Sequence, residues 1–142
     1  MFDVEKTLRL IRTEKYETPF TIGKTINVSF NDAGHILGSS MIRLSVPYNG
    51  ERRTILFSGD VGRWGSPILN DPSLFDSADY VLVESTYGDR VHKDAETVSK
   101  TLAELINRTI REGGKIVIPS FAVERAQELL YRLNGLLGEG AI

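Results

Sequence analysis

The sequence predicts an α/β fold with a mixed sheet and flanking helices, and two patterns carry this prediction. In the first half, apolar and polar residues alternate over residues 25–31, 41–46 and 52–58, as they do in half-buried strands. In the second half, short apolar runs at 80–84 and 115–119 each lead into a segment of helical periodicity. Strand, helix, strand and helix in this order are typical of a parallel α/β unit.

The three alternating segments are predicted to form an antiparallel meander. Asn49-Gly50 separates the second segment from the third, and this dipeptide is a strong signal for a tight hairpin because both residues tolerate positive φ. The runs at 80–84 and 115–119 are almost entirely apolar, so both are predicted to be buried strands.

Three helices are predicted from their caps and apolar stripes. A short helix follows Asp3, a long one follows Asp94 and ends at Gly113-Gly114, and a third follows Ser120 and covers 122–137. The residues expected on their buried faces are Val4, Leu8 and Ile11 in the first helix, Val98, Leu102, Leu105, Ile106 and Ile110 in the second, and Ala126, Leu129, Leu130 and Leu133 in the third.

Composition narrows the classes of function. The chain has 142 residues, of which 41% are hydrophobic and 25% charged, as in globular proteins. Its formal net charge of −2 excludes a strongly basic nucleic-acid module, but not a nuclease whose positive charge is local or carried by a metal. Because there is no cysteine, any metal must bind His, Asp or Glu. No apolar run could span a membrane and no signal-peptide core is present, so the predicted location is the cytoplasm.

Three residues with chemical potential follow the ends of predicted strands: His35, Asp60 and Glu84. Ligands of α/β sheets gather beyond strand ends, because the loops there converge on a crevice. His35 and Asp60 are 25 residues apart and joined by a hairpin, so the chain returns to the same edge and the two side chains are expected side by side. Imidazole together with carboxylate suits zinc or a similar borderline metal.

Each of these residues also has a plain structural interpretation. A histidine between glycines, such as His35, is often a hydrogen-bonded corner, and Asp60 after Ser-Gly could be a turn or a helix cap. Glu84 could be a cap or a partner of Arg63 or Arg90. The residues alone therefore indicate a metal or acid/base site of modest specificity.

The number of possible metal ligands limits such a site. A catalytic zinc usually keeps three protein ligands, and a two-metal site needs more. The chain has 2 histidines, and the second, His92, is most simply a solvated loop residue. His35 and Asp60, with Asp32 or His92, could form one incomplete site and not a dinuclear one.

Four segments resemble, in order and at plausible spacing, the later motifs of the metallo-β-lactamase superfamily, specifically its β-CASP branch of nucleic-acid-processing enzymes. They are DAGHILGSS (32–40), FSGDVGR (57–63), ESTYGDRVH (84–92) and IPSFAVERAQELL (118–130). The resemblance implies that 1–88 is the C-terminal portion of a lactamase-like αββα sandwich and that 89–142 begins the β-CASP domain with its first βα elements. It also implies a zinc-dependent ribonuclease acting in RNA processing, with RNA as partner and two zinc ions in the complete family site.

The same resemblance implies roles for individual residues. His35 matches a histidine ligand of one zinc, and Asp60 matches the carboxylate that bridges both. Glu84 matches an acidic catalytic-site residue that orients a histidine, the general acid of the family. Ser120 and Arg125 are placed to contact substrate phosphate at a helix N-terminus, although helix capping is the simpler role for Ser120.

The chain departs from the family pattern in two places. The His-x-His-x-Asp-His cluster that in the family precedes the DAGHILGSS motif is absent, and so are the later family histidines. The chain is therefore expected to be an internal piece of a longer enzyme and inactive alone. Half of a sandwich would leave an apolar sheet face uncovered, so self-association through that face, or marginal stability, is expected.

Two other functions stay open on the sequence. One is a catalytically dead β-CASP interaction subunit, and the other is a small-ester metallo-hydrolase on the same scaffold. Retention of both His35 and Asp60 disfavours the first, and the ESTYG and IPSF segments disfavour the second. Zinc or manganese, and endonuclease or exonuclease, are equally open.

Overall fold

The computed structural model describes residues 2–91, 95–121 and 123–142 and divides into two compact units. The first unit contains Met1–Ser66 and Asn70–Glu84, and the second contains Pro67–Leu69 and Ser85–Ile142. The domain boundary expected after residue 88 stays a prediction, since compact units and family domains are different divisions.

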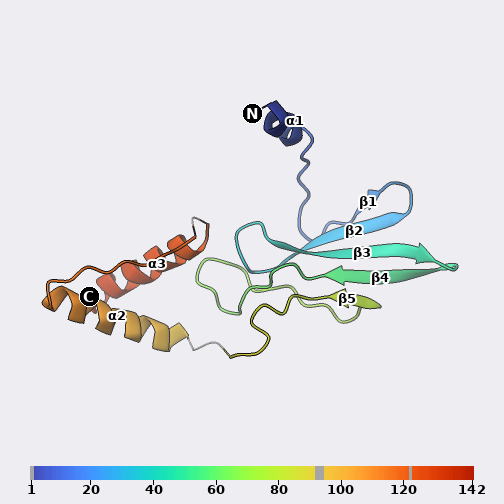
Figure 1. Ribbon diagram of the computed structural model, residues 1–142. Coiled ribbons are helices and arrows are strands. Elements are labelled where there is room, and N and C mark those ends of the chain that lie inside the picture. Colours follow the sequence, from blue (N-terminus) through green and yellow to red (C-terminus); the bar gives the residue numbers. More distant parts are fainter. Residues whose placement is uncertain (1, 92–94, 122) are drawn as a thin grey trace. The chain divides into compact units, whose positions relative to one another are not determined.

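The first unit is a five-stranded mixed sheet with a short helix ahead of it (Figure 1). Its elements are α1 (Phe2–Leu8), β1 (Phe20–Ile22), β2 (Ile26–Asp32), β3 (Ser40–Tyr48), β4 (Glu51–Phe57) and β5 (Tyr80–Leu82). The strands lie in the order β1-β2-β3-β4-β5, antiparallel to their neighbours except for the parallel pair β4–β5. The predicted antiparallel meander is confirmed by β2, β3 and β4.

The hairpin between β3 and β4 forms where the sequence predicts it. Asn49 has φ 49° and Gly50 has φ 82°, and Tyr48 pairs with Glu51 across the turn. Two positive φ values in a two-residue loop match the right-handed twist of the strands that the loop joins.

The expected details of α1 and β5 are wrong in part. Asp3 lies inside the first turn of α1 and does not precede it, and its expected apolar face is exposed. β5 forms, but its three residues are between 51% and 59% exposed. β5 is exposed because it is the outermost strand of the sheet and pairs only with β4.

The two faces of the sheet differ in what covers them. Strand pairing places one set of large apolar residues on a single face: Phe20, Ile22, Ile26, Val28, Phe30, Ile42, Leu44, Ile55, Phe57, Tyr80 and Leu82. Of these, only Val28 is buried within the described residues. The opposite face carries the small core of Ala33, Met41 and Leu56, against which Val61, Phe75 and Ala78 pack. The other residues of the apolar face are half-buried, except for Ile22, Tyr80 and Leu82, which are exposed, so the expected open face is found only in part.

Hydrogen bonds hold the segment between β4 and β5 over the face that carries the core of Ala33, Met41 and Leu56. The Ser73 N–H donates to the Asp32 carbonyl over 2.9 Å, and the Asp79 carboxylate accepts from the Thr54 N–H at 2.7 Å and from the Arg53 guanidinium at 2.8 Å. The Thr54 N–H, followed by the Arg53 side chain, lowers the pKa of Asp79.

Two glycines allow the loop after β2 and the loop after β4 to touch. The Gly62 N–H donates to the Ala33 carbonyl over 2.8 Å, and a Cβ on Gly62 would lie 1.6 Å from the Gly34 carbonyl oxygen. Gly34 has φ 62°, and a Cβ there would lie 2.8 Å from the ring of Pro72. The glycine before His35 is thus required by close backbone packing.

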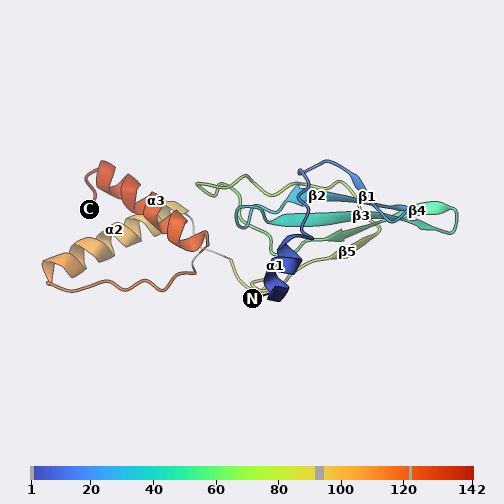
Figure 2. The same ribbon diagram turned by 90° about the horizontal axis from the view of Figure 1, so that it is seen from above.

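The second unit is built on two helices that contact each other and cross (Figure 2). They are α2 (Ala95–Arg111) and α3 (Arg125–Gly138), and they bury Ile106 and Leu136. The Arg132 guanidinium of α3 contacts Glu128 at 2.9 Å and Ser99 of α2 at 3.2 Å. None of the helices in the described ranges is long and apolar enough to cross a bilayer.

The ends of these helices confirm some predicted signals and correct others. Gly113 follows α2 with φ 70°, and its N–H donates to the Ile110 carbonyl, so the predicted glycine stop is confirmed. The Asp94 cap lies outside the described residues. Ser120 is not a cap, because α3 begins at Arg125 and Glu124 occupies the N-cap position with φ 70°.

The run at 115–119 does not form the predicted strand. Its residues belong to no ladder in the part of the chain that is described, and Val117 is 89% exposed. A buried strand needs a neighbour that completes its backbone hydrogen bonds, and the described residues of this unit supply none. An apolar run in the sequence indicates burial without identifying the partner that provides it.

Replacing Gly62 by Ala is expected to separate the two loops, because the added methyl group overlaps the Gly34 carbonyl. We expect a loss of about 1–3 kcal/mol in the free energy of unfolding of the first unit. Urea unfolding followed by the fluorescence of Trp64 measures it, since this single Trp lies in the first unit. Gly135→Ala in α3, where a Cβ has open space, is the control. An unchanged midpoint for Gly62→Ala would contradict the packing argument.

The lowered pKa of Asp79 predicts a pH dependence of stability. The native pKa lies below the unfolded value of about 3.9, so the stabilisation is fully present above that value and is lost as pH falls through the native pKa. Asp79→Asn should make the thermal midpoint fall less steeply between about pH 5 and pH 2. Asp76→Asn, on the same segment and exposed, should keep the original slope. Equal slopes for Asp79→Asn and the unaltered chain would refute the assignment.

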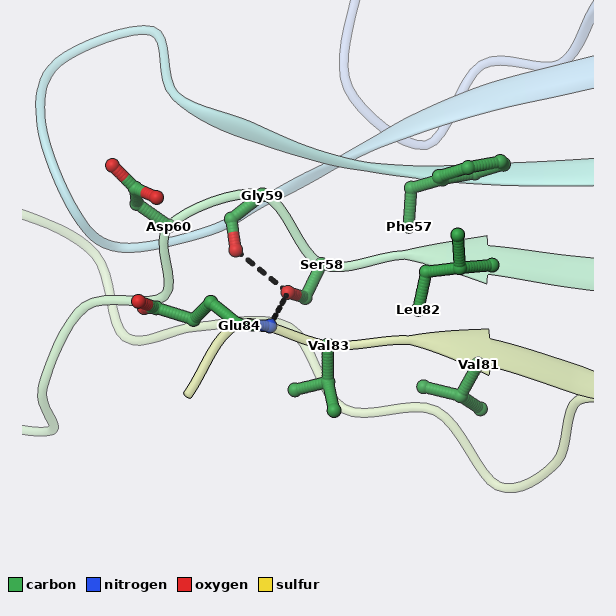
Figure 3. Close-up of a pocket in the computed structure, with 8 residues that line it drawn as sticks. All are labelled: Phe57, Ser58, Gly59, Asp60, Val81, Leu82, Val83 and Glu84. Carbon is green, nitrogen blue, oxygen red and sulfur yellow. Dashed lines mark hydrogen bonds between the residues drawn. The ribbon is translucent and has the colours of Figure 1, made fainter. Parts of the chain in front are cut away.

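The open apolar face predicts self-association. Leu82 and Val81 are neighbours of similar exposure, 51% and 56%, whose side chains point to opposite faces (Figure 3). Leu82→Lys should therefore shift sedimentation toward the monomer, while Val81→Lys should leave the distribution unchanged. A chain that is monomeric at all concentrations, with a sharp thermal transition, would show that this face needs no partner.

Candidate functional site

The candidate site lies at one edge of the sheet in the first unit. β2, β4 and β5 run in the same direction, because β2 and β4 are both antiparallel to β3 and β5 is parallel to β4. Their carboxyl ends therefore share an edge, and His35, Asp60 and Glu84 follow these three ends. The topology places the three residues in the loops where the strand pattern predicts them.

His35 and Asp60 lie side by side. His35 Nε2 is 3.8 Å from Asp60 Oδ2, and the two side chains are 44% and 73% exposed. The expectation that the hairpin returns the chain to this position is confirmed. Both side chains are open to solvent, so each is accessible to a metal ion or another binding partner.

The loop that carries His35 is shaped by two side chains of its own. Asp32 Oδ1 accepts the Gly34 N–H at 2.9 Å, which is an Asx turn. Ser39 Oγ accepts the N–H groups of His35 and Ile36, each at 3.2 Å. These bonds fix the backbone on both sides of the histidine and leave its imidazole in solvent.

Asp32 is occupied by other partners in this structure. Besides the Gly34 N–H, its carboxylate accepts the Asn70 side-chain amide over 3.1 Å. No cluster of three His, Asp or Glu side chains with metal-binding geometry occurs among the described residues. His92, the other candidate for a further ligand, lies outside them.

Glu84 is tied to the loop of Asp60. Glu84 Oε1 accepts the Val61 N–H at 2.8 Å, one residue beyond Asp60. The buried Ser58 hydroxyl accepts the Glu84 N–H over 3.1 Å. The same hydroxyl donates to the Gly59 carbonyl (Figure 3). The ends of β4 and β5 are thereby held together, and the carboxylates of Asp60 and Glu84 both lie beyond the strand ends.

The two arginines predicted as alternative partners of Glu84 have different surroundings. Arg90 pairs with Asp89 at 2.9 and 3.1 Å. The Arg63 guanidinium is exposed, and no acceptor for it occurs among the residues that the structure describes. The observed hydrogen bond to Val61 gives Glu84 a role in shaping the site's backbone.

An open pocket lies along the ends of β4 and β5. Its volume is about 630 Å³, and it is lined by Phe57, Ser58, Gly59, Asp60, Val81, Leu82, Val83 and Glu84 (Figure 3). Two carboxylates at one end and apolar side chains at the other give it a mixed character. His35 is not part of this lining, so the pocket adjoins the His35–Asp60 pair and does not contain it.

Ser120 and Arg125 belong to the second unit. Ser120 is exposed and lies ahead of α3, while Arg125 is the first residue of that helix. Arg125 Nη1 lies 3.8 Å from Glu128 Oε2, so its charge is partly shared with a carboxylate one turn away. The structure brings these two residues to one short segment.

Several residues that shape the site have no obvious sequence signal. Ser58, Ser39 and Asn70 act through hydrogen bonds to residues distant in the chain or across a loop. The Tyr16 hydroxyl donates to the Ser39 carbonyl at 2.8 Å, and burial, with a smaller effect of the Asp32 carboxylate, raises the pKa of Tyr16. Only the position of Ser58 directly before Gly59-Asp60 could have indicated its role.

Comparison with known proteins identifies relatives of this chain. It is 43% identical to Ribonuclease TTHA0252 of Thermus thermophilus over 131 residues, which cover 92% of this chain and 29% of that protein. It is 34% identical to an RNase J-like protein of Methanocaldococcus jannaschii, covering 99% of this chain and 33% of the relative. Transcription termination factor FttA of Methanothermobacter thermautotrophicus is also 34% identical, with coverage of 98% and 22%.

The similarity extends along almost the whole of this chain and along a minor part of each relative. No protein-family model matches the chain. The chain spans a third or less of the length of the three curated relatives just described. It is therefore similar to one segment of proteins that include ribonucleases and a transcription termination factor.

Proposed function

We propose that this chain supplies part of the active site of a zinc-dependent ribonuclease of the β-CASP branch of the metallo-β-lactamase superfamily. The observation that carries the proposal is the 3.8 Å separation of His35 Nε2 and Asp60 Oδ2 at the carboxyl edge of the sheet. The ribonuclease names of two relatives supply the reaction class. In this proposal the complete protein binds RNA and acts in the cytoplasm.

The residues at this edge fit a metal ion. Two ligands at about 2.1 Å from one tetrahedral zinc lie roughly 3.4 Å apart, close to the separation of the two observed atoms. One ligand is an imidazole nitrogen and the other a carboxylate oxygen, a pairing that zinc and manganese both accept. Both side chains are exposed enough to admit the ion without rearranging the core.

The roles of the chain's own residues follow from their chemistry. A metal held by His35 and Asp60 would supply Lewis acidity, which would activate water for attack and offset negative charge on a phosphodiester. His35 contributes a nitrogen lone pair and Asp60 contributes negative charge. The hydrogen bonds of Ser39 and of Glu84 hold the two loops in place while this happens.

We assign Glu84 the role of a positioning residue. Its carboxylate binds the Val61 N–H directly after Asp60, so it restrains the backbone from which the Asp60 side chain projects. The family role of orienting a histidine general acid is compatible with this, because a carboxylate has two oxygens and several acceptor positions. In the same proposal, two residues of the second unit, Ser120 and Arg125, contact a phosphate group of the RNA.

The chain alone is expected to lack ribonuclease activity. His35 and Asp60 are two ligands, whereas a catalytic zinc usually keeps three and a two-metal site more. The described residues contain no cluster of three such side chains. The alternative of a small-ester hydrolase predicts turnover of small esters and none of RNA, so a panel of both substrates distinguishes the two reactions.

A zinc titration by calorimetry tests the metal assignment. We expect stoichiometric binding that weakens at least about tenfold in His35→Ala and in Asp60→Ala, because each removes one of two ligands. Asp76→Ala, which removes an exposed carboxylate elsewhere in the same unit, should bind as the unaltered chain does. Absent binding, or binding that both site variants retain, would show that this chain holds no preformed zinc site at the His35–Asp60 pair.

A further inference from the structure

Trp64 is the single tryptophan of the chain and is 62% exposed. It lies four residues after Asp60, in the loop that leaves the candidate site. One exposed aromatic side chain is ordinary on a protein surface and carries no argument alone. Three features of its surroundings indicate a binding role for Trp64: the anchoring of its loop, the arginine that precedes it and its distance from Asp60.

The loop is anchored on both sides of Trp64. Ahead of it, the Val61 N–H donates to Glu84 and the Gly62 N–H donates to the Ala33 carbonyl, each at 2.8 Å. Behind it, the Gly65 N–H donates to Asp71 Oδ1 at 2.7 Å. The indole is therefore presented to solvent from a short backbone segment that is tied down at both ends.

The residue before Trp64 is an arginine without a protein partner in the described part of the chain. Arg63 is exposed, and no carboxylate or other acceptor engages its guanidinium there. Arg52 and Arg53 of the same unit are engaged internally, the first by Ser45 and Thr25 and the second by Asp79, whereas Arg43, like Arg63, has no side-chain partner among the described residues. A free guanidinium beside an exposed indole offers a phosphate contact next to a stacking surface.

Trp64 is also close in the chain to the His35–Asp60 pair. Four residues of extended chain span at most about 14 Å, which bounds the distance between the Cα atoms of Asp60 and Trp64. A strand of RNA that places a phosphate at the His35–Asp60 pair can therefore place a nearby base on the indole. Single-stranded nucleic acid is bound in this way by a combination of aromatic faces and basic groups.

We propose that Trp64 is a stacking platform for a base of single-stranded RNA held at the His35–Asp60 edge, with Arg63 contacting an adjacent phosphate. This rests on the proposed ribonuclease function and names a substrate-binding position for it. The platform accepts any base, because every base has a π-face. It therefore aligns the RNA without selecting a sequence.

The intrinsic fluorescence of Trp64 reports on this directly. A short single-stranded RNA with 2′-O-methyl riboses, which resists cleavage, is titrated into the chain while tryptophan emission and the anisotropy of a label on the RNA are both recorded. We expect quenching that follows the anisotropy, and a loss of affinity of about tenfold in Trp64→Leu with near-complete retention in Trp64→Phe. Arg63→Gln should lower the slope of log affinity against log salt by about one.

A matched control is available at the opposite end of the sheet. Tyr48 is 56% exposed and lies beside Arg53, whose guanidinium carbon is 5.9 Å from the ring centre, so it offers a similar aromatic and basic pair far from the edge in question. Tyr48→Leu should leave RNA affinity unchanged. An oligonucleotide that lacks bases should bind without quenching Trp64.

The outcomes separate the platform from the ribonuclease proposal. RNA binding that neither quenches Trp64 nor weakens in Trp64→Leu overturns the platform and leaves the ribonuclease proposal in place. Equal quenching by the baseless oligonucleotide also overturns it, since stacking needs a base. Absence of any RNA binding overturns the platform too, and the zinc titration then decides the metal site independently.

Discussion

The candidate site depends on a contact between two backbones. The Gly62 N–H binds the Ala33 carbonyl at 2.8 Å, and the Gly34 carbonyl occupies the space that any side chain at residue 62 would need. His35 is one residue beyond Gly34, and Asp60 is two residues before Gly62. Once the two loops are in this contact, the backbones that carry the imidazole and the carboxylate are held close together, so a steric requirement at two glycines places both residues at one edge.

The third strand end is joined to this contact through side chains. Val61 lies between Asp60 and Gly62, and its N–H is bound by Glu84, so the stretch from 60 to 62 is held by the loop after β2 and by the end of β5. Ser58 adds a bond between the ends of β4 and β5 and is itself buried. The platform proposed at Trp64 extends the same anchored stretch outward, because its loop begins at these bonds.

Local signals in the sequence predict much of this architecture, and signals that depend on a partner predict less. The Asn49-Gly50 turn and the alternation in β2, β3 and β4 are local, and they determine that His35 and Asp60 return to one edge. The run at 115–119 and the burial of β5 depend on neighbours that a sequence does not identify. Ser120 resembles a helix cap, yet α3 begins only at Arg125. The bonds of Ser58, Ser39 and Asn70 join positions whose proximity follows only from the fold.

Because the His35–Asp60 pair is exposed, its position depends on the backbone of the two loops and not on attraction between the two side chains. Side chains that are 44% and 73% exposed attract each other weakly in water, and such a pair contributes at most about 1 kcal/mol. Mutual attraction is therefore too weak to hold the two groups in one arrangement against the entropy of their side chains. Backbone packing at Gly34 and Gly62 fixes the positions from which the two side chains start, and it leaves both groups open to solvent. A ligand set that is held by its supporting loops and still open to water is what a metal-binding edge requires.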